Sequence, residues 1–150
     1  MTREANPIRV GGRDVCVTFT IKGGRANYGV STLCLGLVRP GLEPRDGKFY
    51  GEREESRAWW MGAAYGDLFG SGKEGDDKAG GLRVGDRLTV VLTAGGGVRF
   101  GVNGKERGSG WPAGSIESGT LVVPAVQMYY NGQSVKLEAA TGAEETAWAR

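Results

Sequence analysis

The chain has 150 residues, the size of one domain and enough to bury most of its apolar surface. Its 19 basic and 17 acidic residues leave a net charge of +2, without the basic excess expected of a dedicated nucleic-acid binder. The 28 glycines disfavour long helices, and the lack of histidine excludes Ser-His-Asp and Cys-His catalysis and most zinc sites.

The first half of the chain predicts short strands. Between residues 15 and 22 apolar side chains alternate with polar ones, a period of two that is typical of a half-buried strand. Leu33, Leu35 and Leu37 predict the next inward-facing row. A charged, turn-rich stretch then runs from Arg39 to Arg57, too long for a hairpin loop and typical of a functional or disordered segment.

The second half predicts hairpins. Alternating apolar segments end at Asn103-Gly104 and at Asn131-Gly132, and Asn-Gly between such segments is the strongest short-range hairpin signal. Strands about 10 residues apart with such turns favour a β-sandwich. We therefore predict an all-β, single-domain chain (residues 1–150, core about 8–138), with residues 139–150 as a strand edge or tail.

Cys16 and Cys34 are expected to be free thiols. If their strands paired with each other, both thiols would lie on one sheet face and a bridge would be conceivable. However, two cysteines without an apolar export segment are typical of a reducing compartment. The sequence therefore favours an intracellular, cytoplasmic protein, and no apolar run is long enough to predict a membrane span.

No cofactor or metal is predicted. Gly70 to Gly75 spells the dinucleotide pattern G-x-G-x-x-G, but the polar, glycine-containing stretch that follows cannot begin the helix that such a site needs. The carboxylates at Asp76-Asp77 and between Glu52 and Glu55 lack the spaced oxygen ligands of a dedicated calcium loop.

Adjacent aromatic residues give the best indication of a binding surface. If Trp59 and Trp60 share a strand, their side chains point to opposite faces, so one fills the core and the other must be covered by a loop, the tail or a partner. Tyr129 and Tyr130 repeat this pattern beside Asn131. Each pair is also compatible with one core residue and one surface residue, whereas aromatic clusters at loop ends are typical of recognition surfaces.

The second half resembles a SPRY domain. The similar segments are Gly85-Asp86-Arg87-Leu88, Val98 to Phe100, Asn103-Gly104-Lys105 with Gly108, Val123-Pro124-Ala125-Val126 and Gln133 to Leu137. The first half resembles the family more loosely, at Val17 to Ile21, Leu35-Gly36-Leu37 and Trp59 to Gly62. We therefore expect a SPRY domain without a PRY-type extension, and Arg39–Arg57 has no evident family counterpart.

The resemblance implies a bent antiparallel β-sandwich of the concanavalin-like, jelly-roll type, without catalysis, that binds a short peptide or protein surface through its loops. It also implies a module of a larger protein or complex. In SPRY proteins linked to a SOCS box, the ligand is contacted by an aromatic residue in the loop before the Trp strand and by the residues where the Pro-Ala-Val strand turns. The similar positions in this sequence are Tyr50 and Tyr129 to Asn131. The groove predicted here is lined by Tyr50, one of Trp59 and Trp60, Tyr129, Tyr130 and Asn131, with Arg39 at its rim.

Two other function classes stay open. A carbohydrate-binding domain would use stacked aromatic residues with nearby carboxylates, and Trp59 or Trp60 with Asp67 supplies those residue types. A structural subunit would bury the same aromatic residues permanently in a larger assembly. An enzyme is the least favoured class, because the strand residues predicted to face inward are all apolar.

Overall fold

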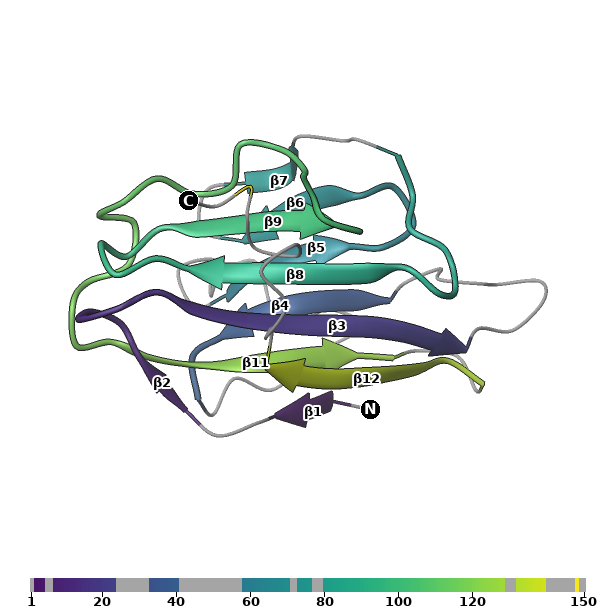
Figure 1. Ribbon diagram of the computed structural model, residues 1–150, viewed down its shortest axis with the longest axis horizontal. Helices are drawn as coiled ribbons and strands as arrows, with labels where there is room; N and C mark the ends of the chain where they lie inside the picture. The colour runs from purple at the N-terminus through teal and green to yellow at the C-terminus, as the bar shows by residue number, and fades with distance from the viewer. Residues whose placement is uncertain are drawn as a thin grey trace.

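The computed structural model describes residues 2–4, 7–23, 33–40, 58–70, 73–76, 80–128, 132–139 and 148. These residues form two antiparallel β-sheets that pack face to face (Figure 1). The predicted all-β sandwich is therefore confirmed. No segment of this described part forms a helix long and apolar enough to cross a membrane.

One sheet has seven strands and the other has five. The seven-stranded sheet has the order β1-β11-β4-β5-β6-β7, with β2 also pairing with β11. Its strands are β1 Thr2–Glu4, β2 Ile8–Arg9, β4 Cys34–Val38, β5 Ala58–Gly62, β6 Asp67–Gly70, β7 Lys73–Asp76 and β11 Leu121–Gln127. The five-stranded sheet has the order β10-β9-β8-β3-β12. Its strands are β3 Val15–Gly23, β8 Arg87–Leu92, β9 Val98–Val102, β10 Lys105–Glu106 and β12 Ser134–Ala139.

The main core lies between the sheets and follows the predicted alternation. Phe19, Ile21 and Phe100 are fully buried, and alternate residues of both sheets complete this core. Arg99, next to Phe100, points to the opposite face and keeps 30% of its side chain exposed. The phase predicted for these strands is therefore confirmed, because a period of two sends neighbouring side chains to opposite faces.

The Gly-Asp and Asn-Gly motifs tie two turns together. Asn103 adopts a φ of 51° and Gly104 a φ of 84°, as a tight hairpin turn between β9 and β10 requires. The Asn103 side chain donates to Asp86 Oδ1 at 3.0 Å and accepts from the Arg87 backbone N–H at 3.0 Å. Asp86 Oδ2 also accepts from the backbone N–H of Arg83 at 2.8 Å. These motifs therefore stabilise the fold.

The cysteines lie on different sheets, which corrects the pairing considered from sequence. β3, which carries Cys16, pairs with β8 and β12, whereas β4, which carries Cys34, pairs with β11 and β5. Neither thiol forms a disulfide bond in this structure. The strands are separated because the chain crosses from one sheet to the other between β3 and β4, which local alternation does not reveal.

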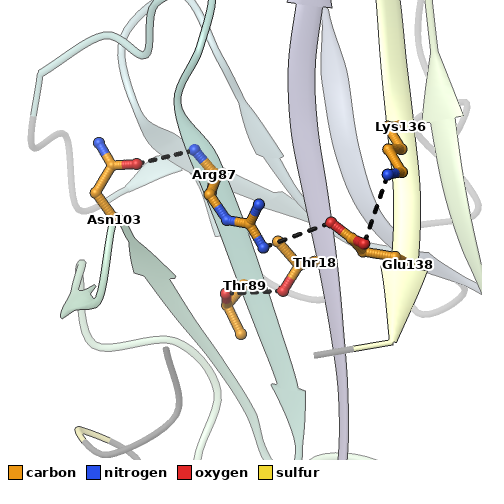
Figure 2. A network of polar contacts seen from close by, with 6 residues as sticks. All are labelled: Thr18, Arg87, Thr89, Asn103, Lys136 and Glu138. Carbon is orange, nitrogen blue, oxygen red and sulfur yellow. Dashed lines mark hydrogen bonds and ion pairs between the residues drawn. The ribbon is translucent and has the colours of Figure 1, made fainter. Parts of the chain in front are cut away.

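The outer face of the five-stranded sheet is more buried than a half-buried strand predicts. Thr18 and Thr89 are 0% and 2% exposed, and their hydroxyl groups lie 3.1 Å apart (Figure 2). Beside them Arg87 on β8 reaches past β3 to Glu138 on β12, at 3.4 Å. The polar residues of these strands therefore form a second packed layer.

Candidate functional site

One end of the sandwich gathers several of the described turns. It includes residues 63–66 between β5 and β6, residues 80–86 before β8, Asn103-Gly104 between β9 and β10, and the residues at which β11 ends and β12 begins. These turns lie at the right of Figure 1. We call this region the turn end.

A tyrosine is displayed on a rigid turn at this end. The Leu82 backbone N–H donates to the Ala63 carbonyl at 2.8 Å, and the Gly80 N–H donates to the Tyr65 carbonyl at 3.2 Å. The turn is therefore fixed to the chain segment that leads into β8. Gly66 completes it with a φ of 65°, and a Cβ at this position would lie 2.3 Å from the Gly80 carbonyl oxygen. Only glycine fits there.

Arg107 holds the same segment from the other sheet. Its Nη2 donates to the Gly80 carbonyl at 2.5 Å, and it comes from the strand end after β10. The position of Tyr65 is thus set by contacts from both sheets. Pre-organised aromatic residues of this kind lose little conformational entropy when they bind a partner.

The turn end also exposes apolar side chains. Tyr65 is 63% exposed and Val84 is 50% exposed; the third large exposed apolar side chain in the described part, Leu121, lies at the opposite end of β11. Tyr65 was not among the site residues predicted from the sequence. The signal available was its place in Ala64-Tyr65-Gly66, a turn sequence between two apolar strands, because an aromatic residue in a glycine turn lies outside the sheet that would bury it.

A row of residues with a polar side chain at each end crosses the outer face of the seven-stranded sheet at the same end. In register from β11 to β6 it contains Gln127, Cys34, Gly62 and Asp67. Gln127 is 5% exposed, and among the described residues its Oε1 has no hydrogen-bond partner. Such buried, unsatisfied acceptors are uncommon in folded proteins and costly. Gln127 lies next to Met128, after which the predicted ligand residues follow.

The structure describes some of the predicted site residues and not others. Tyr50, Tyr129, Tyr130 and Asn131 lie outside the described residues, so their groove stays a prediction. Arg39 is exposed and follows β4 at its Val38 end. Residues 129–131 follow β11, whose last residue, Gln127, pairs with Cys34 at the other end of β4. The two ends are about 13 Å apart along β4, so a groove that includes both must run along the sheet.

Trp59 and Trp60 point to opposite faces of β5, as expected, but neither is exposed. Trp59 is 2% exposed and belongs to the main core. Trp60 is 4% exposed on the outer face, where its ring stacks on Phe69 at 4.5 Å. Asp67 is also buried, with 5% of its surface exposed. These residues therefore do not present the open aromatic platform that a carbohydrate-binding site needs.

The described part of the dinucleotide-like pattern lies in strands, because Gly70 ends β6 and β7 begins at Lys73. Lys73–Asp76 form β7, an edge strand of the seven-stranded sheet. Within the described residues no group of three or more His, Cys, Asp or Glu side chains is placed to hold a metal ion.

Comparison with known proteins gives structural matches only. No family model and no curated protein sequence matches this chain. The crystal structure of the SPRY domain of human HERC1 is similar with a TM-score of 0.65 and 23% identity, over 89% of this chain and 77% of that chain. The crystal structure of a human SPRY domain is similar with a TM-score of 0.66 and 18% identity, over 91% and 82%.

Proposed function

Since the chain has the fold of a SPRY domain, we propose that it is a non-catalytic protein-interaction module that binds a short peptide or a protein surface at the turn end. The fold supports the general class, and one observation supports the place. Tyr65 is 63% exposed on a turn that both sheets hold in position. Rigid, exposed aromatic residues are frequent anchors of protein interfaces.

The predicted ligand residues extend the same surface. Tyr129, Tyr130 and Asn131 follow β11 directly after Gln127 and Met128, at the end that displays Tyr65. In this proposal the tyrosines provide apolar contact, and Asn131 holds an extended peptide by polar contacts. Tyr50 belongs to the 19-residue stretch Arg39–Arg57, which is long enough to reach either end of the sheet.

The experiment begins with a ligand selected by peptide display on the whole chain. Tyr65→Ala should then weaken binding about thirtyfold or more, the effect of losing an anchor worth about 2 kcal/mol. Its thermal midpoint should stay nearly unchanged, because an exposed side chain contributes little to folding. Tyr130→Ala should weaken binding to a similar extent.

Leu121→Ala provides the matched control. Leu121 is an exposed apolar residue, 38% exposed, at the opposite end of β11. The Leu121→Ala variant should bind the selected peptide as tightly as the unmodified chain does. Normal binding by both tyrosine variants, or equal losses with Leu121→Ala, would place the ligand elsewhere and contradict the proposal.

A further inference from the structure

Trp148 lies on the outer face of the five-stranded sheet, against β9. β12 ends at Ala139, which pairs with Val17 of β3, whereas the Trp148 ring lies against Gly101 of β9. β3 and β8 separate these two places in the sheet. Trp148 therefore contacts a strand that two other strands separate from β12.

A missing side chain makes room for the indole ring. One row of the sheet runs in register through Glu106, Gly101, Thr89 and Thr18. Gly101 is its only member without a side chain, and a Cβ there would lie 2.5 Å from Cε2 and Cζ2 of Trp148. The ring consequently packs directly on the backbone of β9.

Arg99 contacts both parts of the tryptophan. Its guanidinium carbon lies 5.4 Å from the centroid of the Trp148 ring, a cation–π distance, and its Nη2 donates to the Trp148 carbonyl oxygen at 3.1 Å. A side chain that contacts the indole ring and the adjacent peptide carbonyl together recognises a tryptophan residue within a polypeptide.

Glu106 holds the arginine in place. Its Oε2 accepts from Arg99 Nε at 2.7 Å, and this hydrogen bond raises the pKa of Arg99 above its ordinary value. Arg99 is thus charged and oriented by a neighbour that belongs to the sheet. We call Arg99, Gly101 and Glu106 the β9 notch.

We propose that the β9 notch is a second binding site, for a peptide segment that carries a tryptophan, and that Trp148 fills it in cis. The notch itself is built from β9 and β10, and Trp148 contributes only its ring and one carbonyl oxygen to the described contacts. A tryptophan segment of a partner would make the same contacts when Trp148 leaves. This site is distinct from the turn end of the proposed function.

Because Trp148 belongs to the same chain as the notch, it competes with any free peptide for the notch, and the experiment measures this competition. A tethered segment acts at an effective concentration of about 1 mM, so a free peptide is excluded from the occupied notch. The probe is a labelled synthetic peptide with the sequence of residues 142–150, titrated into the unmodified chain and into Trp148→Ala and followed by fluorescence anisotropy. If its Kd for the open notch is about 100 µM, Trp148→Ala should bind it about tenfold more tightly than the unmodified chain.

Three controls make the result specific. The peptide with its own tryptophan replaced by alanine should not bind Trp148→Ala. The double variant Gly101→Ala, Trp148→Ala should lose the binding, because the new Cβ fills the notch. Arg99→Met combined with Trp148→Ala should lose it as well, and this variant tests the notch if the Gly101 substitution prevents folding.

Other outcomes would overturn the proposal. Equal peptide binding by the unmodified chain and Trp148→Ala, or no binding to folded Trp148→Ala, would mean that Trp148 is only a structural residue. Binding that survives in both double variants would place the peptide elsewhere. None of these results depends on the turn-end variants, so the two proposals fail separately.

Discussion

The outer faces of the two sheets use the same local arrangement, a tryptophan packed on a glycine, with different consequences. On the seven-stranded sheet Trp60 lies directly opposite Gly36 in the β4–β5 register. On the five-stranded sheet Trp148 lies on Gly101 without any described strand pairing of its own. The first tryptophan is held by the backbone ladder, and the second by side-chain contacts and one described hydrogen bond.

The surroundings of the two tryptophans differ in the same way. Trp60 belongs to an apolar cluster with Val38, Ala58 and Ala125, all at most 1% exposed. Trp148 lies beside the ion pair of Arg99 and Glu106, on a sheet face that also carries the buried hydroxyl groups of Thr18 and Thr89. An apolar layer in ladder register is integral to the fold, whereas the proposal for the β9 notch requires that the Trp148 ring can leave its polar surroundings.

Replacement of the two tryptophans should give the largest difference. Trp60→Ala should lower the free energy of unfolding by about 3–5 kcal/mol, the usual cost of emptying a buried aromatic position. Trp148→Ala should cost less than about 2 kcal/mol, because release of its segment regains chain entropy. Denaturant midpoints of both variants test this, and equal losses would show that Trp148 is as integral to the fold as Trp60.

Replacement of Gly36 and of Gly101 tests the same contrast between the two sheets. A Cβ at Gly36 would lie 2.3 Å from the Trp59 carbonyl oxygen and 2.5 Å from Trp60 Cα, so Gly36→Ala must move backbone. We expect a loss of about 1–3 kcal/mol or more. At Gly101 the three atoms nearest to an added Cβ all belong to the Trp148 side chain, so Gly101→Ala should cost less, while it shifts the Trp148 indole N–H resonance in NMR spectra. A larger loss for Gly101→Ala would contradict this order.

The hydroxyl pair tests whether the polar layer is packed. Thr18→Val removes the partner of the Thr89 hydroxyl, which is buried, and should cost about 1–3 kcal/mol. The double variant Thr18→Val, Thr89→Val should lose less stability than the sum of the two single losses, because the second change removes the hydroxyl group that the first change leaves without this partner. Additive losses in urea denaturation would show that the two hydroxyl groups are not coupled.

The ion pairs at the sheet surface should matter least. Glu138 lies 3.4 Å from Arg87 and 3.8 Å from Lys136, and its side chain is 35% exposed (Figure 2). Glu138→Gln should therefore change stability by less than about 1 kcal/mol, and 1 M salt should remove the difference. A larger, salt-independent loss would mean that Glu138 belongs to the buried layer.

The candidate site was only partly predictable. The sequence placed aromatic anchors around 129–131, which stays a prediction, and it did not identify Tyr65. It also grouped Arg39 with these residues, although Arg39 leaves the sheet from the other end. Such errors follow from topology: a linear pattern shows which residues lie in loops, but the direction of each strand decides which loops share an end.

The sequence by itself determined the phases of the strands that alternate with period two, whereas it did not predict β1, β2, β6 or β7. Alternation of period two and the Asn103-Gly104 turn are local properties, and both appear in the structure where they were predicted. Tertiary structure alone decided the rest. Placing β3 and β4 in different sheets separated Cys16 from Cys34, and the packing of Trp148 on Gly101 covered a face that alternation left exposed. Both depend on contacts between residues distant in sequence, which no local pattern encodes.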